Sequence, residues 1–125
     1  MSFISIENLT TRYNTSKGLV HALEDISFVI DKGESIGIAG ESACGKSTLG
    51  LSIIRMVSNG KIYSGKIQFD GKSLLDMSNA DFDKNIRWKE ISMVFQGAMN
   101  SLDPVFSVQQ QFEEVLKQHN FKENI

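Results

Sequence analysis

One short stretch of the chain constrains its fold more than any other. Residues 40–47 read Gly-Glu-Ser-Ala-Cys-Gly-Lys-Ser and match the pattern G-x-x-x-x-G-K-[ST]. The apolar, partly β-branched run before it, residues 35–40, predicts a buried strand. The residues after it, from Gly45 to about Val57, predict a helix that ends at Asn59-Gly60. A strand, a glycine-bearing turn and a helix in this order predict an α/β P-loop fold.

Each residue type in this loop suits a bound phosphate. Gly40 and Gly45 permit backbone angles and close approaches that a Cβ would block. Successive N–H groups and the start of the helix attract anions. Lys46 would meet the β- and γ-phosphates, the Ser47 hydroxyl would bind Mg²⁺, and Thr48 would touch the α-phosphate. The predicted nucleotide-binding residues here are Gly40, Glu41, Ser42, Ala43, Cys44, Gly45, Lys46, Ser47 and Thr48. The loop therefore predicts a site for a nucleoside triphosphate with magnesium.

Composition narrows the remaining possibilities. A chain of 125 residues suits one domain, and its net charge of −2 indicates no nucleic-acid partner. No apolar stretch approaches the roughly 20 residues that cross a bilayer, so any membrane association is expected through another subunit. Cys44 is the single cysteine, which excludes an internal disulfide. Its backbone N–H is expected to help hold the phosphate. Redox regulation through its thiol is the weaker alternative.

Local patterns predict the other elements. Ser78, followed by Asp81, is typical of a helix N-cap, and the apolar residues of the last segment fall on one helical face. The predictions are strands near residues 3–9, 26–31, 66–69 and 91–95, turns at 31–34 and 70–71, a short helix within 78–88, a loop at 97–104 and a helix at 108–118. The strand at 91–95 is expected to be buried on both faces.

Two flanking features narrow the family. Tyr13 precedes the second predicted strand, and Gln96 follows the strand at 91–95. Together with the Walker A loop, these residues resemble the ATP-binding subunits of ABC transporters. The run at 95–104, Phe-Gln-Gly-Ala-Met-Asn-Ser-Leu-Asp-Pro, is similar to the dipeptide/oligopeptide (and nickel) importer branch. Many members of this family have glycine where this chain has Ala43. The pattern G-x-x-x-x-G-K-[ST] accepts any residue at this position.

The resemblance implies a fold, a set of roles and a set of partners. The fold would be a partial P-loop NTPase domain with an antiparallel β subdomain, and residues 1–125 would be its N-terminal portion, from Walker A to the Q-loop and the following helix. Tyr13 would stack on adenine. Gln96, in the Q-loop, would contact magnesium and the attacking water. The predicted catalytic residues are therefore Lys46 and Gln96. The predicted metal ligands are Ser47 and Gln96.

The same resemblance predicts an assembly. The Q-loop region would face membrane subunits, a second ATP-binding subunit would pair head to tail, and an extracytoplasmic solute-binding protein would act indirectly. The location would be the cytoplasmic face of the cell membrane. Peptide is the first expected solute, with nickel and sugar left open.

Several family motifs have no counterpart in these 125 residues: the signature motif, the Walker B strand with its carboxylates, the D-loop and the switch histidine. We therefore expect the isolated chain to bind nucleotide weakly and to hydrolyse it negligibly. Because apolar sheet surface and a strand edge would be uncovered, the chain is expected to associate with itself or to be the ordered part of a longer product. Two alternatives stay open. One is a truncated, non-hydrolysing nucleotide-binding module, and the other is a small kinase or GTPase, although no Asn-Lys-x-Asp guanine motif occurs.

Overall fold

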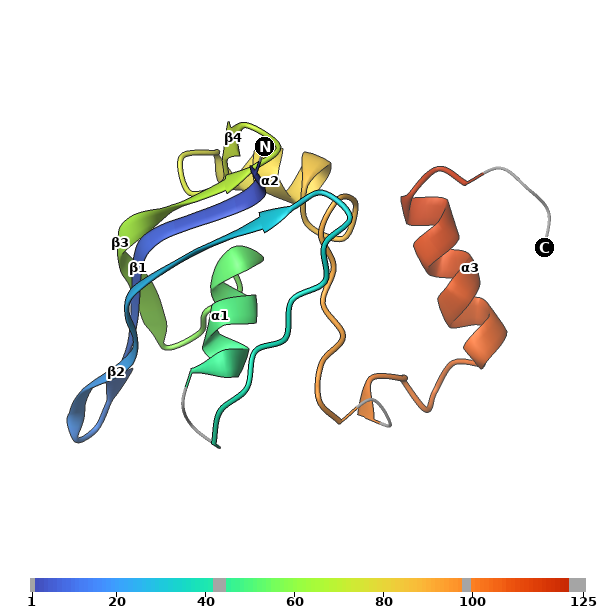
Figure 1. Ribbon diagram of the computed structural model, residues 1–125. Coiled ribbons are helices and arrows are strands. Elements are labelled where there is room, and N and C mark those ends of the chain that lie inside the picture. The colour runs from blue at the N-terminus through green and yellow to red at the C-terminus, as the bar shows by residue number, and fades with distance from the viewer. Residues whose placement is uncertain (1, 42–44, 98–99, 122–125) are drawn as a thin grey trace.

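The computed structural model describes residues 2–41, 45–97 and 100–121. A four-stranded sheet in the order β2-β1-β3-β4 curves over α1, and α3 stands apart from it (Figure 1). The elements are β1 (Ser2–Thr15), β2 (Gly18–Asp31), α1 (Lys46–Ile53), β3 (Gly60–Phe69), β4 (Lys72–Ser73), α2 (Asn79–Asn85) and α3 (Val108–Gln118). None of these helices combines the length and the apolar character needed to span a membrane.

All pairings in the sheet are antiparallel, as the predicted β subdomain requires. β1 is central, and it pairs with β2 and β3 along nearly its full length, so that Tyr13 lies between Val20 and Gly60. The predicted strands extend beyond residues 3–9 and 26–31 because this hairpin pairing continues down to Gly18. The Asp70-Gly71 turn is confirmed, with positive φ at both residues (46° and 80°), the geometry that tight hairpins favour.

The core lies between the sheet and the two helices α1 and α2. Leu49 from α1 and Phe82 from α2 pack with Ile6, Leu9 and Ile67 from β1 and β3, and all five are buried. The cap of α2 is confirmed, since the Ser78 side chain accepts from the backbone N–H of Asp81. The sequence pattern therefore located this helix and the residue that begins it.

Two predicted strands do not form. Residues 34–41 contain no strand, and Ile36 and Ile38 are 44% and 51% exposed. Within 91–95, only a single bridge joins Ile91 to Arg87, and Val94 is 92% exposed. A buried strand needs hydrogen-bonded neighbours on both sides, and the described residues place no strand beside either segment. The apolar side chains of Ile36, Ile38 and Val94 are therefore exposed, but on segments without strands rather than as the predicted sheet surface and strand edge.

The helices differ from prediction in one respect. α1 ends at Ile53 rather than near Val57, because Arg55 takes a left-handed conformation (φ 56°) that a helix cannot continue. α3 has its predicted bounds and a capping box at Ser107. Its apolar face is uncovered, and Phe112 is 64% exposed.

Candidate functional site

The phosphate loop meets α1 at Gly45, which has φ 98° and forms the helix N-cap. A Cβ at this position would lie 2.4 Å from the backbone oxygen of Ala22 and 3.0 Å from Cδ2 of Leu23. Only glycine fits here, for both the backbone angle and the close approach to β2. The predicted contacts at Ser42, Ala43 and Cys44 lie outside the described residues.

The first turn of α1 presents donors at its exposed end. The first N–H groups of a helix have no acceptor within it, and they favour an anion. The Lys46 and Ser47 side chains are exposed there. The Lys46 Nζ donates to the backbone oxygen of Gly40 and, at 3.3 Å, to that of Glu41. The ammonium group therefore reaches from the start of the helix back to the start of the loop.

Tyr13 is brought to the same helix turn from a distant part of the sequence. Its hydroxyl lies 3.1 Å from Oγ1 of Thr48, and the two residues are 35 positions apart. Thr48 is only 7% exposed. The structure thus joins Tyr13 to the phosphate-loop helix, and the Thr48 hydroxyl, expected at the α-phosphate, contacts this tyrosine.

Two further hydroxyl contacts continue along the same helix face. Oγ1 of Thr11 lies 3.0 Å from Oγ of Ser52, which in turn donates to the Thr48 carbonyl at 2.7 Å. Both Thr11 and Ser52 are fully buried. Sequence reasoning missed this pair. The available signal was the spacing of Thr48 and Ser52, which lie on one helix face four positions apart.

An ion pair supports the strand next to Tyr13. The Arg12 Nε donates to Oε1 of Glu24 at 2.9 Å across the β1–β2 hairpin. This hydrogen bond lowers the pKa of the Glu24 carboxyl and raises the pKa of Arg12. Arg12 also lies over the Tyr63 ring, with its guanidinium carbon 5.0 Å from the ring centroid.

Gln96 is exposed at the end of the extended segment after α2. The Phe95 ring before it packs at a tilt against Trp88, with a centroid distance of 6.0 Å. Within the described part of the chain, no hydrogen bond joins Gln96 to the phosphate loop. The structure therefore joins Tyr13 to the first turn of α1 and shows no such contact for Gln96 among the residues it describes.

With this geometry in view, comparison with known proteins identifies the family. Residues 23–124 match the family model described as "ABC transporter". The chain belongs to the ABC transporter family. It is 38% identical over 117 residues to the oligopeptide transport ATP-binding protein OppD of Haemophilus influenzae, and 39% identical over 120 residues to the oligopeptide transport ATP-binding protein AppD of Bacillus subtilis.

These relatives are much longer than the chain. The alignments cover 93% and 94% of this chain but 36% of each relative. The fold also resembles the dimeric bacterial ABC transporter cassette MJ0796, with a TM-score of 0.73 and 23% identity over 98% of this chain and 49% of the cassette. Its post-hydrolysis form bound to ADP and Pi gives a TM-score of 0.74 at 22% identity. The predicted family and the partial P-loop NTPase fold are confirmed.

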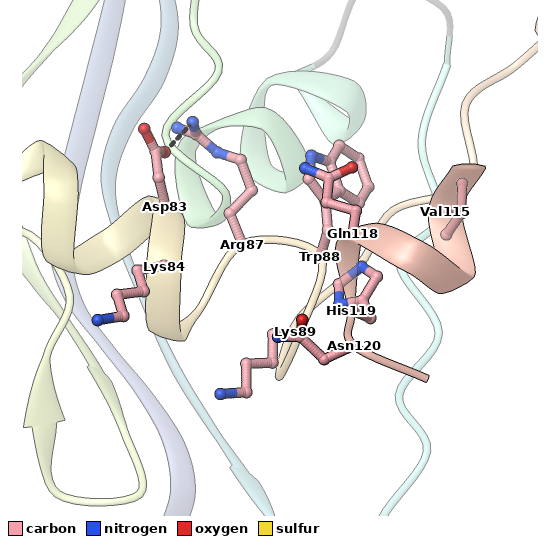
Figure 2. Close-up of a pocket in the computed structure, with 9 residues that line it drawn as sticks. All are labelled: Asp83, Lys84, Arg87, Trp88, Lys89, Val115, Gln118, His119 and Asn120. Atoms are coloured by element: carbon pink, nitrogen blue, oxygen red, sulfur yellow. Dashed lines mark hydrogen bonds and ion pairs between the residues drawn. The ribbon is translucent and has the colours of Figure 1, made fainter. Parts of the chain in front are cut away.

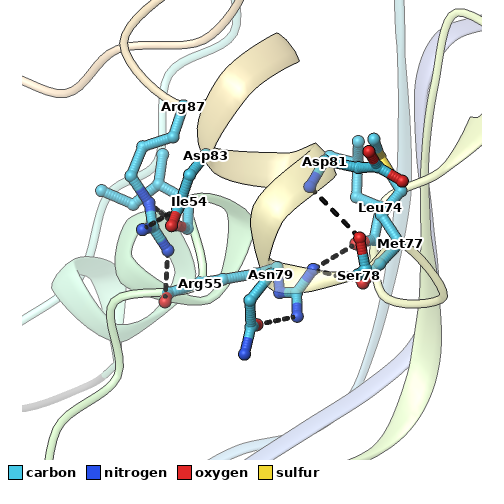
Figure 3. Close-up of polar contacts among 9 residues, drawn as sticks. All are labelled: Ile54, Arg55, Leu74, Met77, Ser78, Asn79, Asp81, Asp83 and Arg87. Atoms are coloured by element: carbon cyan, nitrogen blue, oxygen red, sulfur yellow. Dashed lines mark hydrogen bonds and ion pairs between the residues drawn. The ribbon is translucent and has the colours of Figure 1, made fainter.

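In this ABC transporter chain, two arginines hold the far end of α1. Arg87 donates from Nε to the Ile54 oxygen and from Nη2 to the Arg55 oxygen, each at 2.9 Å. Arg55 donates to the Met77 oxygen at 2.9 Å (Figure 3). The two guanidinium carbons lie 4.8 and 5.1 Å from the Phe82 ring centroid. This arginine pair fastens the phosphate-loop helix to the turn that leads toward Gln96, and sequence reasoning did not find it.

A separate pocket of about 640 Å³ lies between the C-terminal end of α2, with the turn that follows it, and the C-terminal end of α3 (Figure 2). Its lining includes the charged side chains of Lys84, Arg87 and Lys89 and the imidazole of His119. None of the predicted nucleotide-binding residues that the structure describes belongs to its lining. The candidate nucleotide site of the ABC transporter chain is therefore the exposed loop at the start of α1, not this pocket.

Proposed function

We propose that residues 1–125 form the N-terminal portion of an ATP-binding domain in an ABC importer for dipeptides or oligopeptides. The whole protein would couple ATP binding and hydrolysis to solute uptake. The observation that carries the proposal is the start of α1, where glycine is sterically required at position 45 and the Lys46 ammonium group reaches the Gly40 carbonyl. Similarity to oligopeptide and dipeptide transport proteins supports the choice of solute.

The residues of the loop fit a nucleotide with magnesium. Lys46 would exchange its two carbonyl acceptors for oxygens of the β- and γ-phosphates, a stronger charge-assisted contact. The exposed Ser47 hydroxyl would bind Mg²⁺, which neutralises phosphate charge when bound. Tyr13 would stack on adenine from β1. Mg²⁺ would be held by Ser47 and Gln96 together with phosphate oxygens.

The partners follow from the same proposal. Gln96, at the end of an exposed segment, would face membrane subunits on the cytoplasmic side of the membrane. A second ATP-binding subunit would complete the site, and a solute-binding protein would act through the membrane subunits. Lys46 and Gln96 are the proposed catalytic residues, but the 125 residues contain no carboxylate in a Walker B context. We propose that they bind ATP and do not turn it over alone.

Titration of the chain with MgATP in a calorimeter tests the binding site. We expect measurable binding that Lys46→Ala abolishes, because the lysine supplies the only full positive charge among the described residues of the loop. Lys32→Ala, which removes an exposed lysine of the β2 turn, is the matched control and leaves binding unchanged. Binding unaffected by Lys46→Ala would contradict the proposed site.

Phosphate release measured on the same chain tests the second half of the proposal. We expect no turnover above background. Binding without turnover also fits the alternative of a non-hydrolysing module. A robust rate abolished by Lys46→Ala would show that these residues form a complete catalytic site.

A further inference from the structure

Another pocket lies beyond the C-terminal end of α1, at the opposite end of this helix from the phosphate loop. Its volume is about 330 Å³, which is within the range of pockets that hold small molecules. Its walls come from the segment after α1, the start of β3 and the turn after β4. The residues that line it are Arg55, Val57, Gly60, Lys61, Ile62 and Leu75.

This pocket combines apolar walls with positive charge. The side chains of Val57, Ile62 and Leu75 are half-buried. Among the residues that the structure describes, no carboxylate lies within ion-pair distance of Arg55 or Lys61. The whole chain has a net charge of −2, so this positive charge is a local feature. Such a lining suits a ligand that has both an apolar group and a negative charge.

Arg55 is fixed in place by its own contacts. It has a left-handed backbone (φ 56°), which a long side chain adopts only where the surrounding structure imposes it. Its guanidinium donates to the Met77 oxygen at 2.9 Å and to Oδ1 of Asn79 at 2.8 Å (Figure 3), and it lies 4.8 Å from the Phe82 ring centroid. Its Nε–H makes no hydrogen bond with any described residue and is a donor for a ligand. A cation held in this way loses little freedom on binding.

Lys61 supplies the second cation from β3. Its Nζ lies 4.8 Å from the centroid of the Tyr63 ring, which holds the ammonium group by a cation–π contact. The opposing residue on β1 is Arg12, and that cation is neutralised by Glu24. The charge of Lys61 is therefore the one on this part of the sheet that an added anion would balance.

From this geometry we infer that the pocket binds a small aliphatic carboxylate. The aliphatic group packs against Val57, Ile62 and Leu75, and the carboxylate accepts hydrogen bonds from Arg55 and Lys61. The C-terminal residue of a short peptide and a short fatty acid share this chemistry. The inference does not depend on the proposed ATP site, which lies at the other end of α1.

An NMR titration that follows the methyl groups of Val57, Ile62 and Leu75 tests the site. The probes are N-acetylleucine, its neutral amide N-acetylleucinamide, and hexanoate. We expect N-acetylleucine to shift these resonances with half-saturation at about millimolar concentration, as befits a ligand of few atoms. The amide should bind about ten-fold more weakly or not at all, because it lacks the charge that the two cations recognise. Stronger binding of N-acetylleucine than of hexanoate would identify a peptide end as the ligand, and the reverse order a fatty acid.

Two variants locate the binding. Lys61→Met, at an exposed position, should weaken N-acetylleucine binding about two- to five-fold, the range of an exposed ion pair. Val57→Asp, which places a carboxylate in the pocket, should abolish it. The matched controls are Lys66→Met, which removes an exposed lysine of the same strand outside the pocket, and Val29→Asp, which adds the same charge to β2. Both should bind N-acetylleucine normally.

The contrary outcomes are distinct from failure of the ATP site. Equal binding of N-acetylleucine and its amide, or no shift with any probe, would overturn the inference. Equal losses in Lys61→Met and Lys66→Met would show a general charge effect and would overturn it as well. Thermal unfolding checks that Val57→Asp keeps its fold, and if it does not, Lys61→Met decides the question. MgATP binding is expected to be unchanged in Lys61→Met.

Discussion

At the residue scale, the site depends on positions where no other side chain fits. Gly45 is the clearest case, since both its φ of 98° and its contact with the Ala22 oxygen exclude a side chain. Lys46 depends on it, because the helix that carries the lysine begins at this residue. The chemistry of the loop therefore rests on an approach between backbone atoms of the loop and of β2.

Gly45→Ala tests this dependence. We expect the substitution to lower the free energy of unfolding by about 1–3 kcal/mol, because it places a Cβ in a left-handed residue and against a backbone oxygen. It should also weaken MgATP binding, because the helix that carries Lys46 and Ser47 begins at this residue. Urea unfolding and calorimetric titration measure the two effects.

Gly37→Ala provides the control within the same chain. An added Cβ at Gly37 meets no atom within 4 Å, and its φ is not in the left-handed region. We expect wild-type stability and binding. Equal behaviour of the two alanine variants would show that the close approach at Gly45 has no energetic consequence.

At the scale of elements, α1 is a short helix held from both ends. It has 8 residues, too few to be stable alone in water. Hydroxyl contacts with β1 hold its first two turns, and the Arg87 guanidinium binds carbonyl groups beyond its last turn. Packing of Leu49 into the core adds the apolar contribution. The loop is therefore presented by a helix that tertiary contacts stabilise.

Arg87→Met should lower the free energy of unfolding by about 2 kcal/mol. The variant keeps much of the apolar stem but leaves two carbonyl acceptors without the guanidinium, each such contact being worth roughly 1 kcal/mol. Hydrogen exchange should show faster opening of α1. Urea unfolding gives the energy, and the exchange of α1 amides gives its location.

Lys89→Met is the matched control for Arg87, since it removes an exposed cation from the same turn. We expect no more than a few tenths of a kcal/mol from it. An Arg87 variant as stable as this control would argue against a role for the arginine pair in holding α1.

At the scale of the whole molecule, much apolar surface is uncovered. The exposed apolar residues include Ile36, Ile38, Val94, Phe95, Val105, Phe106, Phe112 and Val115. They lie on the two segments that do not form strands, on the loop that follows and on α3. A surface of this kind favours association with other apolar surface.

Sedimentation or light scattering should therefore show oligomers of the 125-residue chain at micromolar concentration. Val94→Asp, at the most exposed of these positions, should shift the distribution toward monomer. Val29→Asp, at an exposed position of β2 that is 57% exposed, is the comparison and should shift it less. A monodisperse monomer in the unaltered chain would contradict the expected self-association.

The sequence by itself determined the features that arise from local pattern. The phosphate-loop motif, the hairpin turn at Asp70-Gly71 and the Ser78 cap of α2 depend on residues close together in the chain, and the structure confirms the last two as predicted. The family resemblance, drawn from the loop, Tyr13 and Gln96, was likewise confirmed. Such features were accessible because backbone preferences and capping act over a few residues.

Tertiary structure decided what depends on distant neighbours. Residues 35–40 and 91–95 have strand-like sequences but form no strands, because a strand is made by hydrogen bonds to adjacent strands that no single segment contains. The contact of Tyr13 with Thr48 spans 35 positions, and Arg87 reaches carbonyl groups more than 30 positions earlier. These groups come within hydrogen-bonding distance only because β1 and α2 fold around α1. The same packing orients Tyr13, the residue proposed to stack on the base.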